Sequence, residues 1–316
     1  TNRCKKRSYF QNRSYASGQT MVSTWSTGSD FVDLANSNLV IKFKVLAPPN
    51  TDYGANFGSG SICNLIENLR VFHRSGTQYT NTQKLNSYRV IEDRNCESTN
   101  WFTSVGSAMG YNMSAFQINE GPADSIFIIP LNKLHPFFNP HGGVMMPPQM
   151  ASGLRVEIDQ ARLGDILTCA NANLPTDFEV SDIYFDIDSV SLMDSAQASI
   201  NTNSQKRSLE YLYSDIFTSR TSNNTNASEV NVDINKSVAY CEKVIGITLI
   251  NFNQNNLSSD GYTTPYQGGS WWYQLGSNQY PSNQKVDSRE IAYIDNLVAW
   301  NKMKGQCGER GQTSLT

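Results

Sequence analysis

Apolar and polar residues alternate along much of the first two thirds of the chain, which is the pattern of strands that bury one face. Leu39 to Val45 shows it most plainly, because Lys42 and Lys44 alternate there with apolar residues. Pro48 and Pro49 end this strand, since proline has no amide hydrogen for a sheet. Residues 126–129 are instead apolar without a break, as in a strand that is covered on both faces. The pattern predicts eight strands before residue 195, at 19–25, 39–45, 68–74, 79–91, 101–105, 126–129, 154–159 and 178–192.

Eight strands joined by long polar loops predict an all-β fold, because eight is the number that one jelly-roll sandwich needs. A change of parity near Ser189 predicts a β-bulge in the last strand. The long segments 46–61, 93–125 and 132–152 are expected to be corner loops between the sheets. We therefore predict an eight-stranded jelly-roll sandwich with an additional C-terminal β-rich module and one helix.

The chain changes character after Asp194. Residues 195–208 and 218–228 are rich in Ser, Asn and Thr and are typical of linkers. Asp287 and Glu290 have the spacing of a capping box and predict the one helix. The predicted organisation is a basic N-terminal arm at 1–14, a jelly-roll domain at 15–195 and a projecting or lateral C-terminal module at 196–316.

Composition narrows the class of protein. Only 17% of the residues are charged, and no run of eighteen apolar residues is present, so no membrane-spanning segment is expected. The sequence has no signal-peptide pattern. Six scattered cysteines without a CxxC pair favour mostly free, buried thiols and a reducing compartment.

Basic residues gather at the start of the chain. The first 29 residues hold five basic side chains and no acidic one, whereas the remainder holds 20 basic and 28 acidic ones. Such an arm is expected to contact the phosphates of packaged nucleic acid, with aromatic rings stacking on unpaired bases. Its deletion is expected to leave the jelly roll intact. The candidate nucleic-acid-binding residues are Arg3, Lys5, Lys6, Arg7, Arg13, Tyr9 and Phe10.

Catalytic motifs are missing from the sequence: it has no P-loop, Rossmann fingerprint, HExxH or GxSxG, and we expect no enzyme and no cofactor. His135 and His141 have no metal-ligand spacing and are expected to be exposed in a loop. Asp182, Asp186 and Asp188 share one face of a predicted strand. A solvated or interface face is the favoured interpretation, with Ca²⁺ between subunits or a glycosidase acid and base as alternatives.

An aromatic cluster, Trp271, Trp272 and Tyr273, follows two glycines. Such a cluster forms core where it is buried, and binds sugar or protein where it is exposed. The aromatic cluster and the aspartates leave two other functions open beside a structural role. These are a secreted β-sandwich carbohydrate-binding protein, which would use the aromatic cluster, and a jelly-roll glycosidase, which would use the aspartates.

Three segments carry a family resemblance: Ser29 to Val45, Phe178 to Leu192 and Trp272 to Pro281. They resemble the coat proteins of bacilladnaviruses, small single-stranded DNA viruses of diatoms, and the likeness covers most of residues 15–300 as a pattern. It implies a viral jelly roll that self-assembles in the virion into an icosahedral T=3 shell around single-stranded DNA. The implied partners are further copies of the chain, the packaged genome and an unknown host receptor, without a membrane. A compact double jelly roll stays open, since the second half faintly echoes the first.

Overall fold

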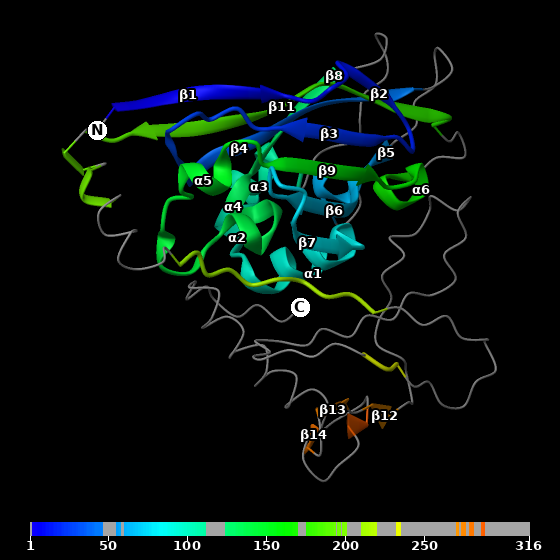
Figure 1. Ribbon diagram of the computed structural model, residues 1–316. Helices are drawn as coiled ribbons and strands as arrows, with labels where there is room; N and C mark the ends of the chain where they lie inside the picture. The colour runs from blue at the N-terminus through cyan, green and yellow to red at the C-terminus, as the bar shows by residue number, and fades with distance from the viewer. Residues whose placement is uncertain are drawn as a thin grey trace.

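The computed structural model describes most of the first 200 residues and short parts of the remainder (Figure 1). The described residues are 2–46, 55–57, 60–111, 124–169, 175–193, 195–196, 198–200, 210–219, 232–234, 270–271, 273–275, 278–280 and 286–287. The predicted helix after Asp287 lies outside them. No helix in these ranges is long and apolar enough to cross a membrane.

Two antiparallel sheets form the body of the protein (Figure 1). The first sheet has the order β1-β11-β4-β8, and β2 pairs with β11 beside β1; the second has the order β3-β9-β6-β7. The strands of the first sheet are β1 (Asn2–Tyr9), β2 (Ser14–Ala16), β4 (Phe31–Leu46), β8 (Asp124–Pro130) and β11 (Asp177–Ser191). Those of the second are β3 (Thr20–Thr24), β6 (Ile66–Phe72), β7 (Gln78–Gln83) and β9 (Arg155–Gln160).

The strand order is that of a jelly roll. If β1, β3, β4, β6, β7, β8, β9 and β11 are lettered B to I in chain order, the sheets read BIDG and CHEF. This is the arrangement of two interleaved Greek keys. The predicted eight-stranded jelly-roll sandwich is therefore confirmed.

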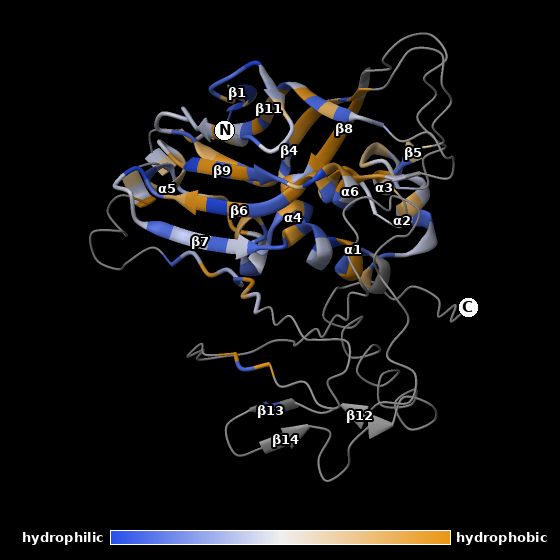
Figure 2. Cartoon of the chain, turned by 90° about the vertical axis from the view of Figure 1, so that its right-hand side faces the viewer, coloured by the Kyte–Doolittle hydropathy of each residue, from blue (hydrophilic) through white to orange (hydrophobic). Residues whose placement is uncertain are grey.

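Alternation along the strands builds the core. In β4, Leu39, Ile41 and Phe43 are fully buried, whereas Lys42 and Lys44 point to the other face. Aromatic rings join the two sheets: Trp25, just after β3, packs edge-on at 5.4 Å from Phe185 of β11. Figure 2 shows the resulting alternation of apolar and polar residues along β6 and β9.

Short helices occupy the long connections between strands. They are η1 (Ile62–Leu65), α1 (Leu85–Cys96), α2 (Thr99–Thr103), α3 (Val105–Ala108), α4 (Leu131–Leu134), η2 (Pro136–Phe138), η3 (His141–Gly143), α5 (Pro148–Ala151) and α6 (Leu163–Ile166). The remaining strands pair in twos: β5 (Ala55–Asn56) with β10 (Thr168–Cys169), β12 (Ser270–Trp271) with β15 (Val286–Asp287), and β13 (Tyr273–Leu275) with β14 (Asn278–Tyr280).

Among these short helices, one strand prediction is wrong and another is confirmed only in its first part. Residues 101–105 form the end of α2 and the start of α3, because the Ser98 side chain accepts a hydrogen bond from the Trp101 N–H and begins a helix there. Residues 79–91 divide at Lys84, whose φ of 54° turns the chain from β7 into α1. The bulge expected near Ser189 lies slightly earlier, between Asp186 and Asp188.

The basic N-terminal segment is the first strand of the jelly roll and not an arm outside it. β1 pairs with β11 over its whole length, from Asn2 opposite Ser191 to Tyr9 opposite Tyr184. Phe10 follows directly and is buried in the core. The expected boundary at residue 14 therefore falls inside the sandwich.

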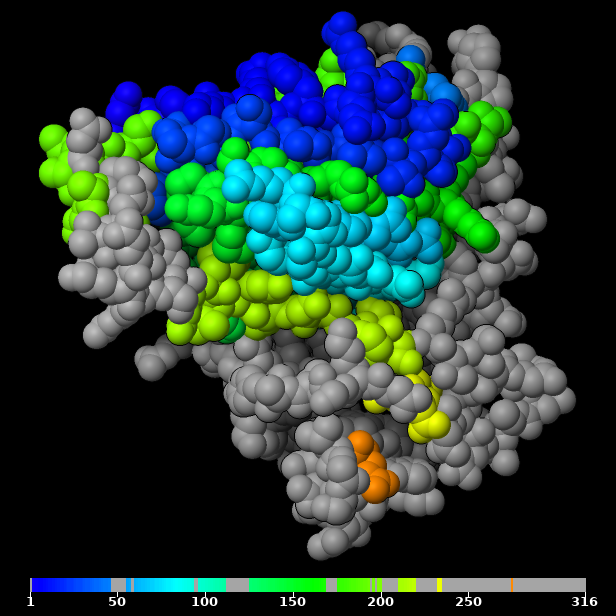
Figure 3. Space-filling view, viewed as in Figure 1, coloured from blue at the N-terminus to red at the C-terminus, as the bar shows by residue number. Residues whose placement is uncertain are grey.

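A segment far along the chain lies against the second sheet. Residues 210–219, here called the strap, run along β7 in extended form (Figure 3). The Tyr213 hydroxyl donates to the Tyr79 carbonyl at 3.0 Å, and the Thr218 hydroxyl donates to the Gln83 carbonyl at 2.7 Å. The strap thus lies beside the edge strand of the CHEF sheet.

The cysteines depart in part from expectation. Cys96 is disulfide-bonded, so the expectation of a free thiol is wrong there. Cys4 and Cys63 are free. Burial raises the pKa of Cys63 to about 12, which keeps this thiol protonated.

Candidate functional site

The outer face of the BIDG sheet, which points away from the CHEF sheet, carries most of the side chains that the sequence singled out. Along β1 and β11, Lys5 lies opposite Asp188 and Arg7 lies opposite Asp186. Opposite charges directly across an antiparallel pair attract each other. The pairing of the first and last strands of the jelly roll thus brings the basic segment onto the acidic one.

Arg3 joins two carboxylates at this face. Its guanidinium lies 3.0 Å from Asp33 of β4 and 3.3 Å from Asp188 of β11. Burial acts to raise the pKa of Asp33, but the hydrogen bond from Asn36 and the charge of Arg3 outweigh it, so this pKa lies below its ordinary value. Arg3 thus joins β4 and β11 through one cation and two carboxylates.

The other basic side chains also have partners. Lys6 donates to Asp30 at 2.6 Å, Arg13 to Asp182 at 2.9 Å, and Lys5 lies 3.7 Å from Asp186. Arg7 sits 4.8 Å from the centre of the Tyr184 ring. Most of the positive charge in the first 29 positions is thus matched by carboxylates from further along the chain.

Asp182, Asp186 and Asp188 do not converge. Asp182 has a φ of 44° and lies in a register shift between Ser181 and Tyr184. Each of the three pairs with a different basic residue of the N-terminal segment. In the part of the chain that the structure describes, no group of three or more His, Cys, Asp or Glu side chains is arranged to hold a metal ion. A calcium contact between subunits stays a prediction.

The two aromatic residues of the basic segment have different positions. Phe10 is buried and stacks on Phe185 at 5.2 Å, so its ring is not accessible to a base. Tyr9 is 59% exposed on the outer face, with its ring 5.5 Å from that of Tyr184. Only Tyr9 is therefore placed to meet a partner.

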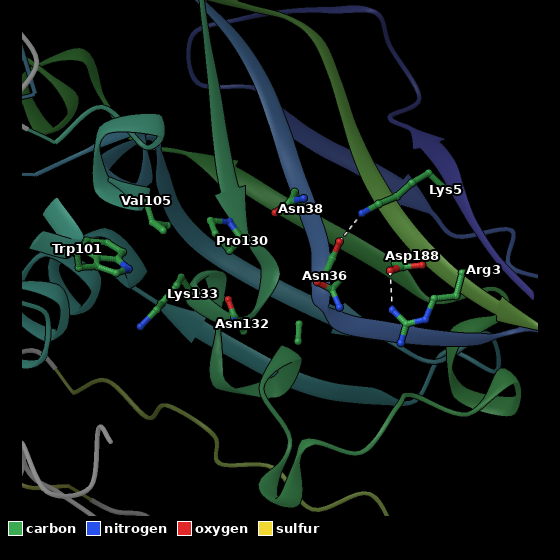
Figure 4. Close-up of a pocket in the computed structure, with 11 residues that line it drawn as sticks. Arg3, Lys5, Asn36, Asn38, Trp101, Val105, Pro130, Asn132, Lys133 and Asp188 are labelled. Carbon is green, nitrogen blue, oxygen red and sulfur yellow. Dashed lines mark hydrogen bonds and ion pairs between the residues drawn. The ribbon is translucent and has the colours of Figure 1, made fainter. Parts of the chain in front are cut away.

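An open depression of about 610 Å³ lies where the outer face meets α2, α3 and α4 (Figure 4). Lys133 of α4 lies 5.5 Å from the centre of the Trp101 ring on one side, and Arg3 and Lys5 lie on the other. Charged, amide and apolar side chains line the depression. None of its lining residues forms a pair of nucleophile and general base. Its lining residues are Arg3, Lys5, Ala35, Asn36, Asn38, Trp101, Val105, Pro130, Asn132, Lys133 and Asp188.

The sequence reasoning missed an apolar row across the same face. Tyr9 lies opposite Tyr184, Tyr184 opposite Val40, and Val40 opposite Ile128. We call these four residues the apolar row. Ile126, two residues before Ile128 in β8, is 65% exposed beside it. The signal was present in the unbroken run 126–129, which predicted burial on both faces, whereas only one face is buried in the part of the chain that the structure describes.

The histidines have structural roles. His135 is fully buried and not exposed as expected: its Nδ1 accepts from the Phe137 N–H at 3.0 Å, so Nε2 carries the proton and donates to Thr82 at 2.9 Å. Burial lowers the pKa of His135 to about 3, with a further contribution from the charge of Arg89. His141, which is exposed, contacts Ser214 of the strap.

The predicted aromatic cluster is described only in its backbone. Trp271 ends β12 and Tyr273 begins β13, whereas Trp272 and the three side chains lie outside the described residues. The cluster therefore stays a candidate surface on sequence grounds.

No protein-family model matches the chain, and no curated protein matches it. Among solved structures, the PBCV-1 protein VP54, fitted into a reconstruction of the virophage Sputnik, has 13% identity and a TM-score of 0.41 over 63% of this chain and 45% of that one. The mavirus major capsid protein has 9% identity and a TM-score of 0.34 over 61% and 47%. The faustovirus major capsid protein has 8% identity and a TM-score of 0.34 over 65% of this chain and 56% of that one. The chain thus spans about half the length of these proteins.

Proposed function

We propose that this chain is a structural capsid protein, a coat subunit that self-assembles into an icosahedral shell. The observation that carries the proposal is the BIDG and CHEF strand order of the jelly roll, an architecture used by viral capsid domains as well as by lectin domains and cupins. The apolar row adds to it, since a shell subunit needs surfaces that bury against further copies.

A structural role rather than catalysis is part of this proposal. On the outer face of the BIDG sheet, the carboxylates pair with cations of the same chain. A glycosidase needs two carboxyl groups placed on either side of a sugar, and one of them must be able to give up a proton. Asp182, Asp186 and Asp188 each pair with a different cation of the same chain and do not converge, so they do not offer that arrangement.

The proposal extends to the packaging of nucleic acid inside the shell. The expected genome is single-stranded DNA, and the expected shell has T=3 symmetry. The support for packaging is the basic strand β1 at the edge of the sheet together with the turn after it, since Lys5 of β1 and Arg13 of the turn keep much of their surface exposed. Phosphates would replace the carboxylate partners there. If all five basic residues engaged single strands, log affinity would fall against log salt with a slope of about −3.5.

Electron microscopy and light scattering of the expressed full chain test the main proposal. Closed particles of uniform size are expected under at least one of several salt and calcium conditions. A folded chain that stays monomeric or dimeric under all of them overturns it. Such a chain that also binds sugar would point to the carbohydrate-binding rival.

The nucleic-acid part has its own test. The double variant Lys5→Gln/Arg13→Gln removes two cations of the basic segment, and Arg74→Gln/Arg162→Gln removes two exposed cations elsewhere as a matched control. Particles of the first variant are expected to carry less nucleic acid, measured by absorbance after purification, than those of the second. Equal loading contradicts this role, and digestion by DNase or RNase identifies the packaged polymer.

A further inference from the structure

Four apolar side chains in line across the sheet form an apolar strip whose two ends are the most exposed to solvent. Tyr9, Tyr184, Val40 and Ile128 come from β1, β11, β4 and β8, so the apolar row crosses the four main strands of the sheet. Tyr9 and Ile128 are 59% and 39% exposed, and Ile126 beside them is more exposed still. Contiguous apolar surface of this kind marks a contact site more often than scattered single residues do.

The pattern of β8 indicates that both of its faces are suited to burial. Phe127 and Ile129 are buried in the core, whereas Ile126 and Ile128 on the opposite face are exposed. A strand with isoleucine on both faces is typical of a sheet that is covered on both sides. Within the described residues only the inner side is covered, so the outer isoleucines are available to a partner.

Charges on either side of the apolar row identify the partner. On one side Arg7 lies opposite Asp186, and on the other Lys42 lies opposite Ser181 and Lys44 lies opposite Glu179. A nucleic-acid surface needs a clear excess of positive charge, whereas these flanks together hold three cations against two carboxylates. A face that is apolar in the middle and carries charges of both signs beside it can be complementary to itself, which a two-fold contact between identical chains requires.

We propose that the apolar row docks face to face on the apolar row of a second copy of this chain. The contact deepens the proposed capsid function by naming one surface through which the subunits meet. A two-fold axis parallel to the strands and between β11 and β4 places Tyr184 over Val40 of the second copy. The same axis places Tyr9 over Ile128 and Lys44 over Glu179.

The size of the face predicts a weak contact. Four strands wide and seven residue pairs long, as β4 and β8 are paired, it measures about 19 Å by about 24 Å, or about 450 Å² per copy. Two such faces together bury less than a stable complex usually does. The isolated dimer is therefore expected to be transient, and the contact becomes strong when a closed shell repeats it.

Cross-linking across the predicted register tests the contact. Tyr9→Cys/Ile128→Cys is made in a Cys4→Ser background and treated with a bis-maleimide spanning about 8 Å, which is too short for the about 14 Å between these positions within one copy. Covalent dimers are expected well above those of the Cys4→Ser chain alone. Moving the second cysteine to Ile126→Cys provides the matched register control and is expected to lower the yield.

A second variant tests the apolar row itself. Ile128→Thr is expected to weaken association about tenfold or more, since each contact buries this side chain twice. Val144→Thr, at an exposed apolar residue off the sheet, is the control and is expected to associate normally. Circular dichroism of both variants separates weakened association from misfolding.

The outcomes separate this inference from the proposed function. Particles that form normally with Ile128→Thr and give no cross-linked dimers overturn the contact but leave the capsid function standing. Cross-linked dimers without particles support the contact and count against the shell. If an oligo-dT strand shields Tyr9→Cys from maleimide while the chain stays monomeric, nucleic acid covers the face and the proposed contact is wrong.

Discussion

Arg3 and Asp188 form a hydrogen-bonded ion pair at 3.3 Å although 185 positions separate them in the chain. The pair exists because β1 and β11, the first and last strands of the jelly roll, are neighbours in one sheet. The basic start of the chain and its acidic strand are thus two halves of one surface. A pair with one half-exposed partner adds little stability alone, but the array fixes β1 in register beside β11.

Deletion of residues 1–14 is expected to destabilise the fold. It removes the whole of β1 from the edge of the BIDG sheet, and with it Phe10 from the core, where losing a buried Phe side chain alone costs about 3–5 kcal/mol. Urea denaturation measures the loss. Lys5→Gln/Arg13→Gln, which keeps the strand, is the control and is expected to stay close to the intact chain. A truncated chain with unchanged stability would contradict the assignment of β1 to the sandwich.

Sequence pattern predicted most of the sheet strands because they bury one face against the other sheet. The predicted strands at 39–45, 154–159 and 178–192 correspond to β4, β9 and β11, each with alternating burial. The run Trp101 to Val105 was misjudged because such residues favour strands locally, and the Ser98 cap decides for a helix instead. The predicted number of eight main strands is nevertheless correct, because β1, which was not predicted as a strand, replaces the wrongly predicted strand at 101–105.

The candidate site was harder to predict than the fold. β1 reads NRCKKRSY, which has almost no apolar signal, so only its pairing with β11 makes it a strand. The charge pattern suggested a free cationic arm because its partners lie far along the chain. The apolar row joins residues from four distant segments. The sequence of any one segment does not determine the register in which the strands pair.

Asp30 is expected to contribute stability that depends on pH. The hydrogen bond from Lys6, and then that from Ser191, lower the pKa of Asp30 below its ordinary 3.8. Its contribution is therefore complete above that value and is lost as the pH falls through the folded-state pKa. Asp30→Asn is expected to cost about 1 kcal/mol at pH 7 and less at pH 3.

Urea denaturation at the two pH values checks this. Asp182→Asn, at the exposed pair with Arg13, is the control and is expected to change stability by less than about 0.5 kcal/mol. An Asp30→Asn penalty that is as large at pH 3 as at pH 7 rules out an ionic contribution.

His135 is expected to act in a different pH window. Its pKa falls from 6.5 in the unfolded chain to about 3 in the folded protein, because burial disfavours the charged ring. The unfolded state therefore binds a proton first, and stability is lost as the pH falls from about 6.5 toward 3. His135→Gln is expected to flatten the dependence of unfolding free energy on pH between 7 and 4, relative to the intact chain. If His135→Gln does not alter this slope, the pH dependence of the unfolding free energy comes from other groups.

Gly110 and Gly18 show two different reasons why this fold needs glycine, namely a positive φ and a lack of space for a Cβ atom. Both have positive φ, of 90° and 75°, so alanine at either position costs about 1–2 kcal/mol through backbone strain. At Gly110 an added Cβ would also lie 2.8 Å from the Phe57 ring and 2.9 Å from the Phe127 ring, whereas at Gly18 it would meet nothing within 4 Å. Overpacking of this kind adds about 1–3 kcal/mol, so Gly110→Ala is expected to lower the unfolding free energy clearly more than Gly18→Ala. Chemical denaturation of the two variants measures the difference. Equal losses would mean that the rings beside β8 yield freely, and that the close approach of Gly110 to Phe57 and Phe127 does not constrain the packing of the core.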